Sequence, residues 1–315
     1  MLASFLNAVS AVVVLFALMA VGYGMGCLGW MTAAEKKFVS RYVVNIAVPF
    51  NCVVGLLNNF SHDALVSAGR MIASAMIGIL LTLGLSALVA TALKLPRKRW
   101  GVFVAMAGSS NTLFIGLPIT TQLFGEVAMP YLMTYYLSSA IFTQSLLVLL
   151  IERAGTATPK KIRVGEMVKD IFTKPPIVGV IVGILLLVLD LRPPELVMKF
   201  SGYISGTVIP LALMYCGFII YEVGLRNLRF LRGIPTMLVV RLGISPLICL
   251  AMCMLTGIDG LARDVFIVES ALPVVTQVTV MAGAFGADEE YAATGACLST
   301  LGCFFTIPIL MLLLG

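Results

Sequence analysis

Two proline-containing apolar segments hold the polar side chains best suited to bind a ligand. The first reads Gly-Ser-Ser-Asn-Thr-Leu-Phe-Ile-Gly-Leu-Pro over 108–118, and the second reads Glu-Ser-Ala-Leu-Pro-Val-Val-Thr-Gln-Val-Thr over 269–279. Because proline lacks the amide for a helical bond and clashes with the preceding turn, we expect both helices to break, near Gly116 and Pro118 and at Pro273. A broken helix presents backbone amides and a positive dipole end, which suits an anion.

Either proline alone could be a plain kink, but two interruptions in corresponding segments favour a transport site. Asn111 could form a helix–helix hydrogen bond instead of binding a ligand, and the break expected beside it favours the ligand role. The candidate substrate-binding residues at the two breaks are Ser110, Asn111, Thr112, Thr276 and Gln277.

Glu269 and Arg241 are the ionisable side chains that we place well inside apolar segments. Such groups are costly in lipid and usually face a cavity or a partner. Glu269 precedes Pro273 by about one turn and could take up a coupling proton, while structural anchoring stays open for both residues. We expect neither metal nor cofactor, because the chain has a single His62 and its seven cysteines form no metal-type pairs.

The composition identifies the solvent that these segments face. Of 315 residues, 60% are hydrophobic and 11% are charged, with a mean hydropathy of +1.05, whereas soluble domains carry roughly 25% charged residues. The 21 Lys and Arg exceed the 15 Asp and Glu, but they fall in short gaps between apolar runs and therefore indicate topology, not nucleic-acid binding. An integral membrane protein is predicted, and a soluble enzyme is excluded.

Ten apolar runs are long enough, or nearly so, to cross the bilayer, and without the alternation of a porin they are expected to be helices. Most of the basic residues follow the first, third, fifth and seventh runs, so the positive-inside rule places both termini outside. We expect the protein to lie in the cell inner membrane. The runs are 4–28, 41–58, 70–93, 100–124, 127–151, 176–191, 200–222, 233–257, 263–286 and 291–314.

The basic stretch 152–175 divides the chain into halves of five spans, 1–151 and 176–315, and is predicted to be a cytoplasmic connection. Because five is odd, the second half must enter the membrane inverted relative to the first. The predicted fold is an all-α membrane protein of two inverted five-helix repeats, in which the fourth and ninth helices are broken. The stretch 31–40 is expected to be an interfacial helix or turn.

Several short motifs resemble those of the auxin efflux carrier family, which joins plant auxin exporters to bacterial permeases of malate and malonate type. The likeness covers most of the chain from about residue 100 onward. It rests on Asn-Thr-Leu at 111–113, Gly-Leu-Pro at 116–118, Phe-Gly at 124–125, Glu-Arg-Ala-Gly at 152–155 and Ala-Leu-Pro at 271–273.

The resemblance implies that spans four and nine cross as broken helices, that spans 1, 2, 6 and 7 form a usually dimeric scaffold, and that spans 3–5 and 8–10 form a mobile transport unit. Asn111 matches a substrate-pocket asparagine of the family, and Pro118 and Pro273 match its crossover prolines. Ser138 and Ser139 fall where span five lines the pocket; the plant members carry an amide there, so the substrate contacts differ.

The predicted function is secondary transport of a small mono- or dicarboxylate such as malonate or malate. The expected partners are the carboxylate, lipid, a coupling H⁺ or Na⁺ and a second copy of the chain. The alternative is a sodium- or proton-coupled carrier of another substrate class on the fold of cation/proton antiporters or bile-acid symporters. An intramembrane enzyme would need a nucleophile with its base, which this sequence does not offer inside its apolar segments. A receptor or structural protein is the remaining alternative.

Overall fold

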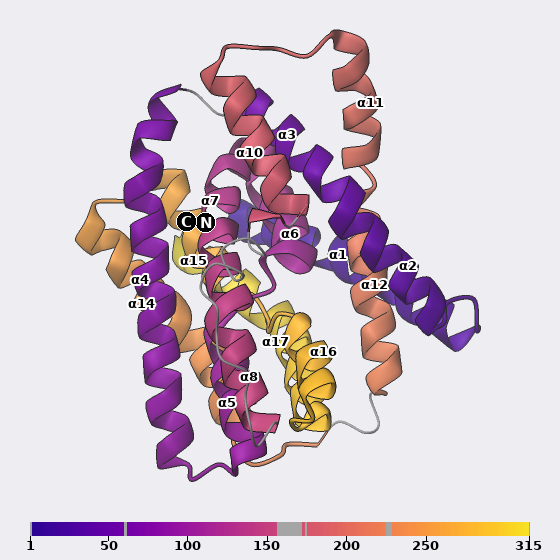
Figure 1. Ribbon diagram of the computed structural model, residues 1–315, viewed down its shortest axis with the longest axis vertical. Coiled ribbons are helices and arrows are strands. Elements are labelled where there is room, and N and C mark those ends of the chain that lie inside the picture. The colour runs from indigo at the N-terminus through magenta and orange to yellow at the C-terminus, as the bar shows by residue number, and fades with distance from the viewer. Residues whose placement is uncertain (1, 60–61, 156–171, 174, 225–228, 315) are drawn as a thin grey trace.

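The structure is a computed structural model that describes residues 2–59, 62–155, 172–173, 175–224 and 229–314. Within these ranges the chain is helical and has no β-strand (Figure 1), as expected for a helical membrane protein. The number of crossings and the inverted repeat stay predictions. Five stretches here are long and apolar enough to span a bilayer, namely Ala33–Asn58, Gly69–Ala92, Glu195–Val223, Ile234–Thr256 and Glu289–Leu314, and shorter apolar helices cover Val13–Cys27, Thr112–Phe124 and Pro175–Val188.

A first helix group forms around two close helix–helix contacts, in which α1 packs on α12 and α3 packs on α10 and α11. A Cβ added at Gly22 of α1 would lie 1.9 Å from the Met214 carbonyl oxygen, and one at Gly217 of α12 would lie 1.8 Å from that of Met19. Glycine therefore lets these two helices touch backbone to backbone. The group comprises α1 (Leu2–Cys27), α2 (Ala33–Tyr42), η1 (Val43–Ala47), α3 (Val48–Asn59), α10 (Pro175–Val188), α11 (Glu195–Ser205) and α12 (Val208–Val223).

A second helix group is built on α4, which packs against α5, α7 and α14, while α8 packs against α5 and α16. Its members are α4 (His62–Ala92), α5 (Arg97–Gly108), η2 (Thr112–Gly116), α6 (Leu117–Phe124), η3 (Glu126–Ala128), α7 (Met129–Phe142), η4 (Thr143–Leu147), α8 (Val148–Gly155), α13 (Ile234–Val239), η6 (Val240–Ile244), α14 (Ser245–Thr256), α15 (Gly260–Ser270), α16 (Gln277–Phe285) and α17 (Glu289–Leu314).

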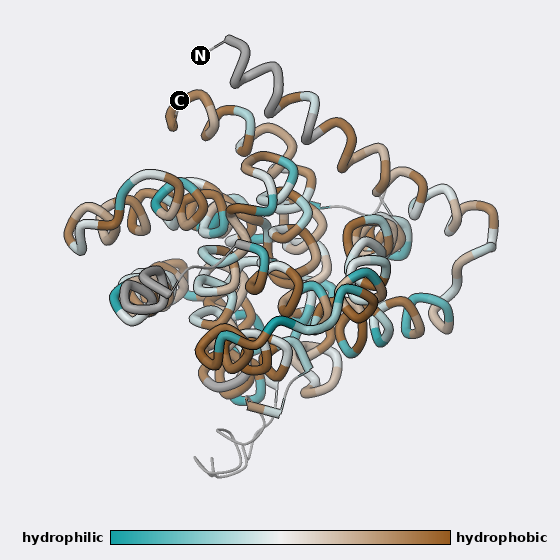
Figure 2. Tube along the Cα trace, turned by 90° about the horizontal axis from the view of Figure 1, so that it is seen from above, coloured by the Kyte–Doolittle hydropathy of each residue, from teal (hydrophilic) through white to brown (hydrophobic). Residues whose placement is uncertain are grey.

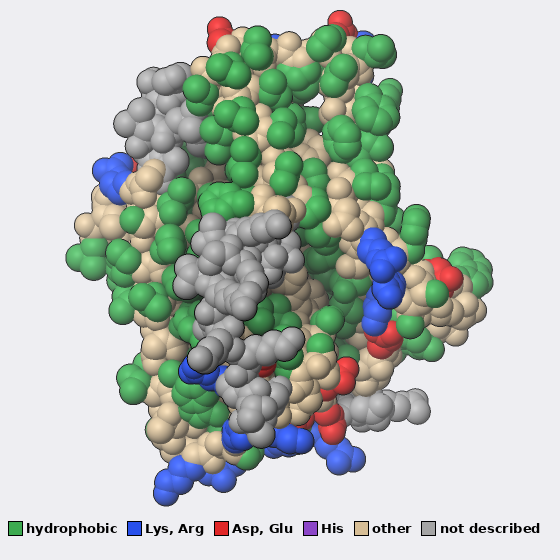
Figure 3. Space-filling view, viewed as in Figure 1, with side chains coloured by type: hydrophobic (Ala, Val, Ile, Leu, Met, Phe, Trp, Pro, Cys, Tyr) green, Lys and Arg blue, Asp and Glu red, His purple; other side chains and the backbone are tan. Residues whose placement is uncertain are grey.

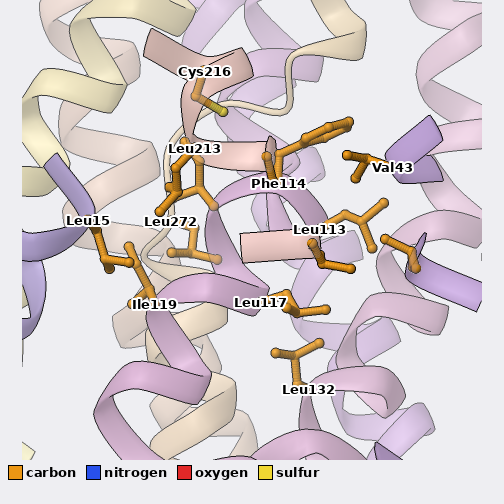
Figure 4. Close-up of a cluster of buried hydrophobic side chains, with 14 of the residues drawn as sticks. Leu15, Val43, Leu113, Phe114, Leu117, Ile119, Leu132, Leu213, Cys216 and Leu272 are labelled. Carbon is orange, nitrogen blue, oxygen red and sulfur yellow. The ribbon is translucent and has the colours of Figure 1, made fainter. Parts of the chain in front are cut away.

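The two groups meet around η2 and α6. Leu117 of α6 lies in one buried cluster with Val43 of η1, Leu132 of α7 and Leu213 of α12 (Figure 4). The ring of Phe114 in η2 stacks on Tyr215 of α12 at 4.8 Å between centroids. Seen from above, α1 runs along one flank beside the end of α17 (Figure 2). The second half of the fourth predicted span thus lies between the groups.

The flanks of the molecule are apolar. Hydrophobic side chains are spread over the upper part and the flanks of the face in Figure 3, whereas Lys and Arg gather at the lower end, where α4 gives way to α5, and along α2. Leu255 and Phe305 are 81% and 65% exposed. Large exposed side chains of this kind over whole helices fit lipid contact better than water contact.

Three of the four π-helical turns in the described chain precede a proline by two residues: η1 precedes Pro49, η2 precedes Pro118 and η6 precedes Pro246. Proline removes one helical hydrogen bond and crowds the carbonyl four residues back, and a wider π turn relieves that crowding. Gly116 and Pro118 therefore lie in a continuous helical run. The expectation that they mark a helix break was wrong for this reason.

The second apolar segment begins earlier than predicted. Its first helix, α2, starts after Thr32, whose hydroxyl accepts a hydrogen bond from the Ala34 amide while Glu35 closes the capping box. The chain then runs through η1 into α3 without interruption. The stretch 31–40 is thus the beginning of a long helix, not a separate interfacial helix. Of the basic connection 152–175, residues 156–171 and 174 lie outside the described residues.

Candidate functional site

The helix over the fourth predicted span is interrupted at residues 109–111. α5 ends at Gly108, Ser109 is extended (φ −128°, ψ 131°), and η2 begins after Asn111. The Asn111 Oδ1 atom accepts a hydrogen bond of 3.2 Å from the Phe114 amide and so caps the new helix. The interruption is made by this cap, seven residues before Pro118.

The helix over the ninth predicted span is interrupted between Ser270, the last residue of α15, and Gln277, the first of α16. Pro273 lies inside this gap, where sequence analysis expected the break. The following amide, of Val274, donates a hydrogen bond of 3.0 Å to the Ser299 hydroxyl on α17. A side chain of α17 therefore supports the non-helical backbone.

The two interruptions pair with each other as a short antiparallel bridge between Ser110 and Val274. The Asn111 amide donates to the Pro273 carbonyl at 2.8 Å, and the Val275 amide donates to the Ser109 carbonyl at 3.3 Å. Backbone groups released by the helix breaks thus satisfy one another, as buried amides and carbonyls require. This pairing fixes the point at which the two segments cross.

Arg241 of η6 holds the two helix ends that stop at the crossing. Its Nη1 donates to the Ala107 carbonyl of α5 at 3.1 Å, and its Nη2 donates to the Ser270 carbonyl of α15 and, at 2.8 Å, to the Ser245 hydroxyl. The side chain is 1% exposed. A cation at two converging helix C-termini offsets their partial negative charge, so Arg241 has a structural function at this site.

A cavity of ≈ 80 Å³ lies on the other side of the crossing, between the two interruptions, α7 with η4, and Val44 of η1 and Pro176 and Ile177 of α10. A water needs roughly 10–15 Å³ on this scale, so several non-hydrogen atoms fit. No Lys, Arg, Asp or Glu of the described residues lines it. Its polar wall is formed by Ser110, Asn111, Thr112, Ser139, Thr143, Thr276 and Gln277.

Asn111, which lines this cavity, has an unused hydrogen-bond donor. Its oxygen is used by the cap, whereas Nδ2 has no hydrogen-bond partner among the described residues, although the residue is only 1% exposed. The first amides of a helix also have no acceptors within that helix. The N-terminal ends of η2 and α16 both border the cavity, so the cavity gathers donors and two positive dipole ends.

The structure separates the two adjacent serines of α7. Ser139 lines the cavity, but the Ser138 hydroxyl donates to the Thr134 carbonyl at 3.0 Å and does not line it. Neighbouring residues of a helix point about 100° apart. Helical spacing from Ser139 leads instead to Tyr136 and Thr143, two lining residues that the sequence analysis missed and that this spacing could have found.

Glu269 lies beside the crossing but does not line the cavity. Its Oε1 accepts a hydrogen bond of 2.6 Å from the Thr120 hydroxyl on α6, its Oε2 has no partner among the described residues, and the side chain is 0% exposed. The three acceptors described for Arg241 do not include this carboxyl group. The two buried ionisable groups therefore have different surroundings.

Other parts of the described chain offer less to a ligand. A cleft of ≈ 550 Å³ lies between α3 and α11, but its charged residues, Arg192, Glu195 and Lys199, are exposed, and Glu195 and Lys199 pair with each other. Among the described residues, no group of three or more His, Cys, Asp or Glu side chains is arranged to hold a metal ion. The buried polar donors thus converge at the crossing.

The chain matches the model of a family described as "membrane transport protein" over residues 7–311. It is 23% identical over 306 residues to an uncharacterized transporter of Methanocaldococcus jannaschii, with 95% of this chain and 96% of the relative covered. It is 24% identical over 318 residues to an uncharacterized transporter of Methanothermobacter thermautotrophicus, with 97% and 98% covered. These matches confirm the resemblance to the auxin efflux carrier family.

Proposed function

Because the chain belongs to the membrane transport protein family, we propose that it is a secondary transporter that carries a small organic anion across the membrane. The substrates that fit are mono- or dicarboxylates of the size of malonate or malate. The observation that carries the proposal is the Asn111 side chain at the cavity wall, which caps a half-helix with its oxygen and leaves its buried Nδ2 donor unused.

Electrostatics support an anion in preference to a cation. Each helix N-terminus stabilises an anion by up to about 2 kcal/mol in a partly buried setting, and the ends of η2 and α16 converge here. No acidic side chain of the described residues lines the cavity to attract a cation. A carboxylate would accept hydrogen bonds from Asn111 Nδ2 and from the hydroxyls of Ser110, Thr112, Ser139 and Thr276, with Gln277 at the α16 end.

The position of the cavity supports transport by alternating access. Its walls come from both helix groups, with η1 and α10 on one side and the crossing and α7 on the other. In our proposal the first helix group is the scaffold, through which two copies of the chain form a dimer. The second helix group is the moving unit. Sliding one past the other would open the cavity to each side in turn.

The same proposal includes the topology that the family resemblance implies. Ten spans would form two inverted repeats, 1–151 and 176–315, joined by a cytoplasmic connection. The chain would lie in the cell inner membrane with both termini outside. The distribution of Lys and Arg supports this orientation, and accessibility labelling of single cysteines in the connections would test it.

Uptake into proteoliposomes tests the function. The purified chain would be offered labelled malonate, malate and related acids, with neutral and cationic solutes as controls, and each with and without proton and sodium gradients. We expect saturable uptake of at least one carboxylate. Uptake of a neutral or cationic solute and of none of the acids would instead support a coupled carrier of another substrate class.

A further inference from the structure

The Glu269 carboxyl group is a buried acid that has no counter-ion among the described residues. It lies on α15, one residue before the Ser270 carbonyl that Arg241 binds, yet its described hydrogen bond is to the Thr120 hydroxyl at 2.6 Å. Its Oε2 has no partner among the described residues. A buried carboxylate that lacks a cation is costly, whereas the neutral acid is tolerated. This position therefore suits a carboxyl group that holds a proton.

The elements packed against α15 bring few charges toward this acid. They are α14, α7, α6, η2, η3 and α17, and η2 and α6 carry no ionisable side chain. Tyr135 of α7 lies near both Glu269 and Arg241. The buried ionisable side chains that these elements and η6 carry are Tyr135, Arg241, Cys249, Cys253, Tyr291, Cys297 and Cys303, whereas Glu126 of η3 is exposed.

Two contacts connect this acid to the cavity. A Cβ added at Gly116 would lie 2.6 Å from the Glu269 Oε2 atom, so the carboxyl rests on η2, the helix that Asn111 caps at its other end. Tyr135 of α7, in turn, lies near both Glu269 and the Ser110 side chain, which lines the cavity. A negative charge at Glu269 would lie roughly 7 Å along the helix from the end that attracts the anion.

We propose that Glu269 is the proton-binding site of this transporter and that one proton is carried with the anion. This inference rests on the proposed function. Ionised Glu269 and a bound carboxylate repel each other, whereas the protonated acid does not. By linkage, anion binding then draws a proton onto Glu269 and protonation strengthens anion binding by the same factor. Because anion binding and proton binding strengthen each other, the proton and the anion would cross in the same direction, as in symport.

The substitution Glu269→Gln separates the charge from the shape. The amide oxygen can still accept the Thr120 hydrogen bond, and the side chain imitates the protonated acid at every pH. We expect malonate affinity in wild type to rise about tenfold from alkaline to mildly acidic pH, as is typical of coupled sites, and to stay constant in the variant. A pH dependence unchanged by Glu269→Gln would overturn the proposal.

Glu126→Gln is the matched control. Glu126 lies in η3, between the fourth and fifth predicted spans, and partial burial raises the pKa of its carboxyl group, so its substitution removes an acid that lies outside the predicted spans. A pH-indicator dye added to weakly buffered protein would report proton uptake when malonate binds. We expect uptake in wild type and Glu126→Gln and none in Glu269→Gln; uptake in Glu269→Gln would overturn the proposal.

Infrared titration of the protein without substrate distinguishes failure of this inference from failure of the proposed function. We expect a protonated carboxyl band at neutral pH that is absent from Glu269→Gln and present in Glu126→Gln. If that assignment holds and malonate and the other acids do not bind, the anion function is wrong and the proton site stands. If the band is missing from wild type, the proton site is wrong.

Discussion

Four helix ends meet at the crossing, and the two C-terminal ends have different surroundings from the two N-terminal ends. The C-terminal ends of α5 and α15 are joined by one buried guanidinium, whose two Nη atoms donate to both ends while its Nε has no partner among the described residues. The N-terminal ends of η2 and α16 border a cavity that is lined by Asn111, whose Nδ2 donor is unused. The difference indicates that the negative ends are closed by the protein itself and that the positive ends are left for a ligand.

The largest effect, on stability, is expected from removing the guanidinium that joins the C-terminal helix ends. Arg241→Met keeps much of the volume but removes the donors to the Ala107 and Ser270 carbonyls. Hydrogen bonds from charged groups contribute roughly 1.5–3 kcal/mol each, so we expect at least about 3 kcal/mol of destabilisation, measured as a lowered denaturation midpoint in detergent. Arg241→Lys restores the charge but not the fork that reaches both helix ends, and should recover part of this loss.

Arg263→Met is the control for that measurement. Arg263 is partly exposed and pairs with its neighbour Asp264, so its loss should change stability by no more than about 0.5 kcal/mol. Equal midpoints for Arg241→Met and Arg263→Met would show that the guanidinium does not hold the crossing together.

The smallest effect, on carboxylate uptake, is expected from removing a single hydroxyl from the cavity wall. Ser139→Ala removes a cavity-lining group and should weaken carboxylate uptake by a few-fold, since one neutral hydrogen bond contributes about 1 kcal/mol. The Ser138 hydroxyl bonds only within its helix in the described structure, so the Ser138→Ala variant should transport as wild type does. Comparable losses in both variants would contradict the placement of the cavity wall.

Much of the fold could be predicted from the sequence, because long apolar runs can satisfy their backbone only as helices. Pro273 also marked its interruption correctly. Pro118 did not, since a proline signals a π turn as readily as a break, and the cap at Asn111 was the more specific signal. The partners of Arg241 could not be predicted: they are backbone carbonyls contributed by two segments far apart in the chain, which no residue type reveals.

Ser138 and Ser139 have different surroundings for a geometric reason. The family resemblance points to both residues, but adjacent residues point in different directions on a helix, so only Ser139 lines the cavity. The roles of all the lining residues as substrate ligands stay predictions.

Substitution of Asn111 by Asp tests the central claim most directly. The carboxylate can still accept the Phe114 amide and cap η2, but it replaces the Nδ2 donor by a negatively charged acceptor. We predict a denaturation midpoint close to that of wild type together with at least a tenfold loss of malonate affinity and uptake, the equivalent of about 1.4 kcal/mol or more. Undiminished malonate transport by Asn111→Asp would contradict an anion site at this helix crossing.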